Sequence, residues 1–177
     1  MHPLVALAKL AVETFIKEGK IISFVPPEIP KEFLEKRAGV FVTIMKNKEL
    51  RGCIGTYLPT TQNIAKEVIQ NAISAATQDW RFPPITKKEL PFLSFTVYIL
   101  SQPELVKDLK ELDPKKYGII VKSISDKETP PKTGLLLPDL EGVDTIEKQI
   151  SIACQKAGID LKKEKILIYK FKVKKYS

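Results

Sequence analysis

Two runs, Val40-Phe-Val-Thr-Ile-Met45 and Leu50-Arg-Gly-Cys-Ile-Gly-Thr56, decide how this chain folds. The first run alternates apolar and small polar residues as a half-buried strand does. Residues 47–49, Asn-Lys-Glu, are polar and separate the two runs, which predicts a β-hairpin.

The second arm of this hairpin departs from ordinary strand composition at Gly52 and Gly55. A glycine inside a strand marks a bulge or a close approach by another backbone or a ligand. Side chains alternate across a strand, so we expect Arg51 and Cys53 to share one face. A guanidinium close to a thiol favours the thiolate form.

Apolar periodicity along the rest of the chain predicts an α+β fold, with a largely antiparallel sheet and about three main helices. The expected helices cover residues 3–18, 31–35, from Thr60 or Thr61 as cap to Thr77, and from Asp144 as cap to Gly158, with a further short helix after a Thr86–Glu89 capping box. The expected strands after the hairpin are 92–100, 117–124, 134–138 and 166–176, the last one an exposed edge, with a helical turn within 103–113 and a loop over 125–133.

The net charge indicates which kinds of binding partner to expect. The net charge is +8 over 177 residues, which favours anionic partners. Only Arg37, Arg51 and Arg81 are arginine, and the other basic residues are lysine. Arginine is the residue expected for bidentate phosphate and base contacts, so a solvated lysine coat explains most of this charge. Nucleic-acid binding is therefore an alternative that we do not favour from charge.

The histidine and cysteine content narrows the chemistry. His2 is the one histidine, so a Ser-His-Asp triad, a Cys-His pair or a histidine-based zinc site is not expected. We expect no metal and no cofactor. Without a secretion signal or an apolar run of 18 residues, Cys53 and Cys154 are expected to be free thiols in a cytoplasmic protein.

Several residues have both a structural and a functional interpretation. Cys53 is a nucleophile, a redox thiol or a small buried hydrophobe, whereas Cys154, on an apolar helix face, is expected to pack in the core. Arg51 either pairs with a carboxylate or receives an anionic substrate. Asp79 and Arg81 lie in the irregular segment 79–84, where they either cap and pair locally or carry function. Asp139, after an apolar strand, is a weaker candidate.

These segments together resemble the AMMECR family. Residues 50–56 resemble its signature, residues 79–84 with Glu89-Leu-Pro91 its second motif, and residues 134–138 its third, in order over nearly the whole chain. Residues 140–144 and 156–158 are similar to the branch called AmmeMemoRadiSam system protein A. Trp80 departs from the family pattern, which usually has a small residue or proline there.

The resemblance implies one AMMECR-type domain over residues 1–177, with a larger sheet-and-helix lobe, a smaller lobe and a cleft between them. It implies neighbours, a Memo-like protein related to dioxygenases and a radical SAM enzyme. The reaction is not fixed by the resemblance, nor is it certain that the protein is an enzyme. We expect an enzyme or enzyme subunit acting on a nucleotide or modified base. The alternatives are a non-catalytic module that binds these partners and a basic nucleic-acid-binding protein. The expected catalytic residues are Cys53 and Asp79, and the expected substrate-binding residues are Arg51, Gly52, Gly55, Thr56, Arg81 and Phe82.

Overall fold

A computed structural model of the chain describes residues 1–124 and 129–177. It has two antiparallel sheets with helices packed on them, so the α+β prediction is confirmed. The chain divides into two compact units, one of residues 1–100 with 174–177 and one of residues 101–173. Residues 125–128 of the expected loop lie outside the described residues. The cleft stays a prediction.

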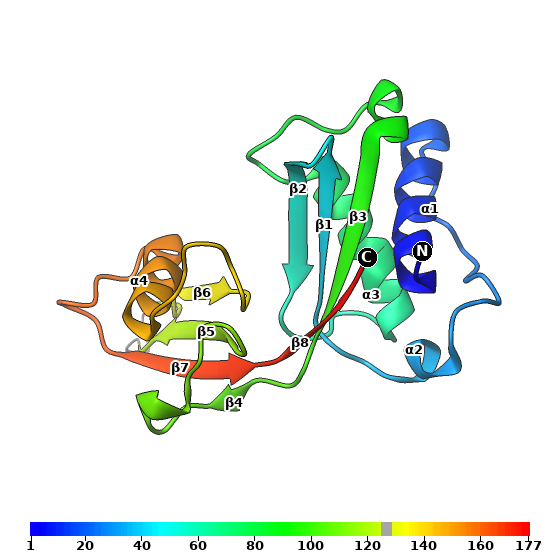
Figure 1. The fold of residues 1–177 in the computed structure, drawn as a ribbon. Coiled ribbons are helices and arrows are strands. Elements are labelled where there is room, and N and C mark those ends of the chain that lie inside the picture. The colour runs from blue at the N-terminus through cyan, green and yellow to red at the C-terminus, as the bar shows by residue number, and fades with distance from the viewer. Residues whose placement is uncertain (125–128) are drawn as a thin grey trace. The chain divides into compact units, whose positions relative to one another are not determined.

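The first unit is built on a four-stranded sheet in the order β2-β1-β3-β8 (Figure 1). The strands are β1 (Val40–Lys46), β2 (Glu49–Thr56), β3 (Leu93–Leu100) and β8 (Val173–Tyr176). The hairpin prediction is correct: β1 pairs antiparallel with β2, and the turn residues Asn47 and Lys48 both have positive φ. Two positive φ angles in a two-residue loop match the right-handed twist of the flanking strands.

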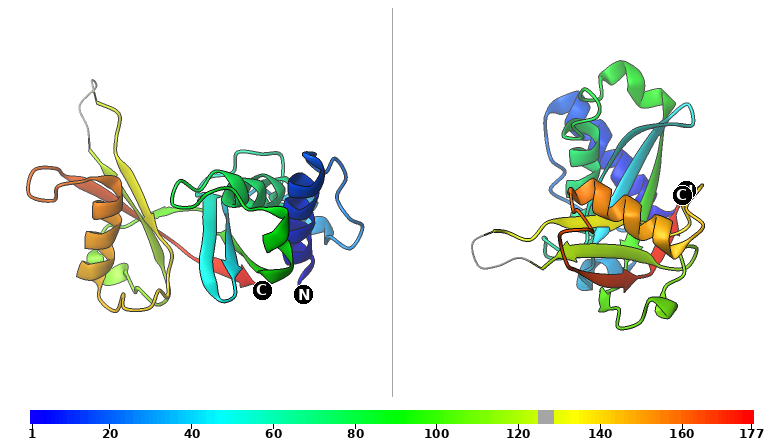
Figure 2. Two further views of the ribbon diagram at one scale, coloured as in Figure 1. Left: turned by 90° about the horizontal axis from the view of Figure 1, so that it is seen from above. Right: turned by 90° about the vertical axis from the view of Figure 1, so that its left-hand side faces the viewer.

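Helices α1 (Pro3–Glu18) and α3 (Ile64–Thr77) pack on one face of this sheet and on each other, as Figure 2 shows. The core between them includes Val40, Val42 and Ile44 of β1, which alternate along the strand and are fully buried. The opposite face therefore carries the intervening residues, among them Thr43, which is half-buried. The short helix α2 (Lys31–Glu35) contributes Phe33 to the same core.

The helix caps differ from two of our expectations. The cap of α3 is Asn63, whose side chain accepts a hydrogen bond from the Lys66 amide, and not Thr60 or Thr61. The cap of α4 (Ile146–Ala157) is Thr145, and not Asp144, which instead pairs with Lys115. Asn, Asp, Ser and Thr are all good caps, so composition does not choose among neighbours of these types.

The second unit has a sheet in the order β4-β7-β5-β6, with α4 packed on one face. The strands are β4 (Glu104–Leu105), β5 (Gly118–Ser123), β6 (Thr133–Leu136) and β7 (Ile166–Phe171). Cys154 on α4 is 2% exposed within this core, so the packing interpretation of this residue is confirmed. Gly134 of β6 lies directly under α4, because an added Cβ would come within 2.1 Å of the Ala153 carbonyl oxygen.

The expected single strand over residues 166–176 is wrong. It divides into β7, which lies inside the second sheet, and β8, which lies at the edge of the first. The backbone of Lys172 exchanges hydrogen bonds with Ser101 at the point of division. The edge prediction therefore holds for β8 and fails for β7.

Two short 3-10 helices complete the fold. η1 (Lys87–Phe92) begins at the predicted Thr86–Glu89 capping box, and η2 (Leu109–Glu111) supplies the helical turn expected within 103–113. Within the described ranges, no helix combines the length and apolar character needed to cross a bilayer.

Candidate functional site

The second arm of the hairpin is shaped by close packing and by a bulge. An added Cβ at Gly52 would lie 2.1 Å from the Ala75 carbonyl oxygen of α3, so only glycine lets the helix lie this close. Gly55 lies against Phe41 of β1 in the same way, at 2.3 Å. Ile44 pairs with Gly52 and Met45 with Leu50, so Arg51 is an extra residue without a partner in the β1 register. Bulges re-aim a side chain and often lie next to functional sites.

Arg51 pairs with Glu89 of η1. Its Nε and Nη2 atoms donate to the two carboxylate oxygens at 2.9 and 3.3 Å. Lys46 donates to the same carboxylate at 3.0 Å, and the amide and hydroxyl of Thr86 donate as well. The hydrogen bond from Arg51, partly offset by burial, holds the pKa of Glu89 well below its usual range. Two cations meet one carboxylate, so this group keeps one net positive charge.

Asp79 holds the open edge of β2. The residue is 5% exposed, and its carboxylate accepts the outward-facing Cys53 amide at 2.8 Å. It also accepts the Arg81 backbone amide and two guanidinium N–H groups, at 2.9 and 2.7 Å. The Arg81 hydrogen bond is the largest cause of a pKa lowered to about 2, with burial acting against it. The expected capping and pairing roles of Asp79 and Arg81 are therefore both present.

Arg81 and Phe82 extend the site from the same loop. The Arg81 side chain is 40% exposed, and its Nη2 atom lies 3.5 Å from the Cys53 carbonyl oxygen. The guanidinium carbons of Arg81 and Arg51 lie 5.5 and 5.8 Å from the centroid of the Phe82 ring. This ring therefore links the two arginines through cation–π contacts.

Cys53 is half-buried and pairs with Thr43 of β1, on the sheet face opposite to the buried Val42 and Ile44. Its Sγ atom lies 3.1 Å from the Thr43 hydroxyl on β1, where either atom can donate. The pKa of Tyr98 on β3 is raised chiefly by burial and also by the charge of a Cys53 thiolate, while a hydrogen bond with Thr43 opposes this. A thiol, a hydroxyl and a phenol thus lie on adjacent strands.

Sequence reasoning missed the carboxylate that organises Thr56. Glu67 of α3 is completely buried and accepts from the hydroxyls of Thr56, Thr60 and Thr61 at 2.6 to 2.8 Å and from two backbone amides. These hydrogen bonds outweigh the effect of burial, so the pKa of Glu67 is lowered. A Glu on a helix is usually a surface residue, but a Thr-Thr pair seven and six positions before it was the available signal.

The sequence that forms this site matches a known protein family. The family model described as AMMECR1 matches residues 5–176. The chain belongs to the AMMECR1 family. The predicted family is confirmed; the narrower AmmeMemoRadiSam branch stays a prediction.

Three relatives illustrate the extent of this AMMECR1 similarity. A Thermotoga maritima protein is 50% identical, over 99% of this chain and 97% of its own length. Protein CA_C1420 of Clostridium acetobutylicum is 44% identical over 98% of this chain, which spans only 36% of that protein. The crystal structure of the uncharacterized protein PH0010 from Pyrococcus horikoshii has a TM-score of 0.84 at 31% identity, covering 98% of this chain and 89% of that one.

The first unit thus brings together most of the expected site residues of this AMMECR1 protein. Arg51 and Arg81 both contact the Phe82 ring, and Asp79 contacts Cys53 and Arg81. The Thr56 hydroxyl donates to Glu67 of α3. Asp139 is exposed with positive φ, 3.9 Å from Lys115, in the second unit. Within residues 1–124 and 129–177, no group of three His, Cys, Asp or Glu side chains is placed to hold a metal ion.

A pocket of about 550 Å³ in the first unit does not coincide with this cluster. It lies between the end of α1, residues 21–23 and α3, with Phe15, Ile69 and Ile73 among its lining residues. The pocket therefore lies between α1 and α3, whereas the reactive side chains lie around Cys53 on β2. We base the functional argument on the side chains, because they supply the chemistry.

Proposed function

We propose that this protein acts on a nucleotide or a modified nucleic-acid base, with Cys53 as the reacting group. The observation that carries the proposal is a half-buried thiol 3.1 Å from a hydroxyl, on a strand whose edge donates a hydrogen bond to Asp79 and accepts one from Arg81. A cysteine with hydrogen-bonding and cationic neighbours is a candidate nucleophile even without a histidine.

The proposal gives each neighbour a separate task. Asp79 fixes the Cys53 backbone through its amide, and with it the position of the thiol. Arg81 has two N–H groups committed to Asp79, and its exposed side keeps donors for a phosphate or another anion. Arg51 is only 12% exposed and bound to Glu89. It therefore contributes to anion binding through the net positive charge that it forms with Lys46 and Glu89, and through its contact with the Phe82 ring.

The resemblance to the AmmeMemoRadiSam branch adds a setting to this proposal. A Memo-like protein and a radical SAM enzyme would then be the functional neighbours, and the reaction would be shared among them. In that setting the half-buried Cys53 handles an intermediate.

Ligand binding tests the substrate class directly. Trp80 is the only tryptophan in the sequence and lies next to Asp79 and Arg81, so its fluorescence reports on this site. We expect nucleoside phosphates to quench it. The double variant Asp79→Asn with Arg81→Gln should abolish the effect without leaving a buried charge unpaired, whereas Arg37→Gln, at an exposed arginine, should not. Absence of quenching in the unmodified protein refutes nucleotide binding here.

Thiol reactivity tests the role of Cys53 separately. We expect iodoacetamide to modify Cys53 in the folded protein well before Cys154, which is 2% exposed and whose pKa is raised by burial. Mass spectrometry of the digested protein distinguishes the two sites. If Cys53 is as inert as Cys154, it is not the nucleophile.

A second function, binding of a protein partner, is favoured by one observation. Trp80 is 92% exposed on a loop whose neighbours on both sides are hydrogen-bonded. An exposed tryptophan beside an arginine is typical of the centre of a protein interface. Co-purification of the Memo-like or radical SAM protein that is lost in Trp80→Ala, with thiol reactivity intact, would support this function over catalysis.

A further inference from the structure

Tyr117, which directly precedes β5 in the second unit, has three lysine ammonium groups around its ring. The ammonium groups of Lys116, Lys170 and Lys172 lie 5.2, 5.2 and 5.9 Å from the centroid of its ring. Cation–π attraction holds each ammonium near the ring, although the three like charges repel one another. A cluster of this kind is stabilised by an anion.

The backbone beneath the cluster is fixed. The Tyr117 carbonyl accepts from Gln149 Nε2 at 2.8 Å, and the Tyr117 amide donates to the Asp113 carbonyl at 2.8 Å. The Lys172 carbonyl accepts from the Ser101 amide at 2.9 Å, and the Lys172 amide donates to the Ser101 hydroxyl at 2.9 Å. The backbone at Tyr117 and at Lys172 is therefore held in place before any ligand arrives, which reduces the entropy lost on binding.

One of the three charges is already neutralised. Lys170 is 15% exposed and donates to Glu111 at 2.9 Å, a bond that raises the pKa of Lys170. Glu104, which pairs with Lys170 across β4 and β7, adds negative charge on the same side. Lys116 and Lys172 are exposed, and in the part of the chain described here no carboxylate lies within 4.0 Å of either ammonium. Two uncompensated charges thus flank one aromatic ring.

We propose that Lys116 and Lys172 bind the phosphate backbone of a single-stranded nucleic acid. Both ammonium groups lie within 6 Å of the same ring centroid, so one strand reaches both with the same or neighbouring phosphates. The half-buried Tyr117 ring adds an aromatic surface for an unpaired base. Residues 101–173 contain no arginine, so the contacts are of the backbone-positioning kind and do not read sequence.

This inference deepens the proposed function and rests on it for one point, the identity of the substrate. If the base handled at Cys53 belongs to a polynucleotide, the second unit supplies the affinity for its backbone. A free nucleotide does not require the Tyr117 cluster. The two proposals therefore depend on different residues in different units.

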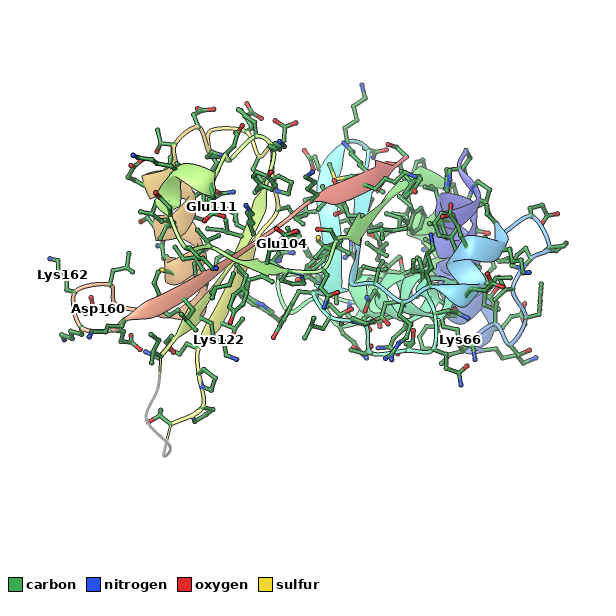
Figure 3. All side chains as sticks on the ribbon, turned by 90° about the horizontal axis from the view of Figure 1, so that it is seen from below. Lys66, Glu104, Glu111, Lys122, Asp160 and Lys162 are labelled. Atoms are coloured by element: carbon green, nitrogen blue, oxygen red, sulfur yellow. The ribbon has the colours of Figure 1, made fainter. Side chains whose placement is uncertain are left out.

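Fluorescence anisotropy with a labelled single-stranded RNA of about 12 nucleotides tests the surface. The test variant of the full chain is Lys116→Gln with Lys172→Gln. The control is Lys66→Gln with Lys162→Gln, which removes the same total charge from two exposed lysines at other places, both labelled in Figure 3. Duplex RNA of the same length is titrated alongside.

Two phosphate contacts on a single strand predict a slope of about −1.4 in log affinity against log salt, or about sevenfold weaker binding between 50 and 200 mM salt. The dependence of log affinity on log salt should be less steep by about 1.4 in the test variant than in the unmodified protein, and it should be unchanged in the control. Equal affinities of the two variants, binding that does not change with salt, preference for the duplex, or no binding by the unmodified protein each overturn the inference.

Quenching of Trp80 by a mononucleotide separates this failure from that of the proposed function. A test variant that loses RNA but keeps mononucleotide quenching supports both proposals. RNA binding without mononucleotide quenching supports the surface and refutes the site at Arg81. Mononucleotide quenching without RNA binding supports the site at Arg81 and refutes the surface around Tyr117.

Discussion

Substitution of Asp79 by Asn removes the charge that joins the loop 79–84 to β2 while keeping the side-chain shape. The carboxylate is 5% exposed and holds the Cys53 amide and three N–H groups of Arg81. An Asn side chain can still accept from Cys53, but its amide group faces a guanidinium that has no acceptor. We therefore expect Asp79→Asn to lower the free energy of unfolding of the first unit.

The pKa of Asp79 gives the magnitude. It falls from 3.8 to about 2 on folding. A group with a lowered folded pKa adds stability above its unfolded pKa and loses it as the pH falls through the folded value. The shift corresponds to about 2.4 kcal/mol at pH 7, about 1.3 at pH 3 and about 0.4 at pH 2. Because Arg81 is 40% exposed and screened by solvent, the measured values should lie somewhat below these.

The assay combines urea unfolding, followed by circular dichroism, with amide hydrogen exchange. Exchange is needed because the chain has two compact units and the effect belongs to the first one. The Cys53 amide, which donates to Asp79 at 2.8 Å, should lose protection first. Glu28→Gln, at an exposed carboxylate of the same unit, is the control.

Two results would refute this reasoning. One is a loss of stability in Asp79→Asn no larger than in Glu28→Gln at pH 7. The other is a loss that stays constant between pH 7 and pH 3, because that would assign the effect to shape and not to charge.

Three further predictions concern the stability of the first unit. Gly52→Ala places a methyl group 2.1 Å from the rigid Ala75 carbonyl and should cost about 3 kcal/mol or more in urea unfolding; a cost under about 1 kcal/mol would contradict the close packing of α3. Glu67→Gln replaces one fully buried acceptor oxygen by an NH2 group, which then faces the hydroxyl and amide donors around it. The substitution should cost about 3 kcal/mol in urea unfolding. A neutral effect would show that water replaces the lost acceptor. His2 caps α1 through Nδ1, and burial lowers its pKa below 6.5. Its contribution to the free energy of unfolding should therefore be lost as the pH falls below about 6.5. His2→Asn should keep the cap and make the melting temperature less dependent on pH in that range, and an unchanged pH dependence would rule His2 out as its source.

Local pattern predicted the fold well where neighbours in sequence are neighbours in space. The hairpin, its Gly52 and the Thr86–Glu89 capping box followed from residues a few positions apart. The division of residues 166–176 did not, because it depends on a backbone contact between Lys172 and Ser101, 71 residues away. Alternating Lys and apolar residues look the same in an edge strand and in a strand that changes sheets.

The candidate site was predictable in its members and not in its pairings. Rare arginines and a glycine-broken strand marked Arg51 and Arg81, and both lie in one cluster around Phe82. The partner of Arg51 was missed, because Glu89 also completes a capping box and that local task explained its presence. The glycines indicated a bulge as one alternative, but its place at Arg51 was not predicted, since register depends on the facing strand.

The satisfied charges of the cluster make Asp79→Asn informative about function as well as stability. An anion that needs the whole Arg81 fork has to displace Asp79, which accepts two of the guanidinium N–H groups. Removing that competing charge should then tighten nucleotide binding, while the protein becomes less stable. An anion that uses only the exposed side of Arg81 gains much less from the substitution. A cluster that serves only to hold the fold shows the loss of stability with no binding to tighten, so opposite signs in the two measurements are the signature of an anion site at Arg81.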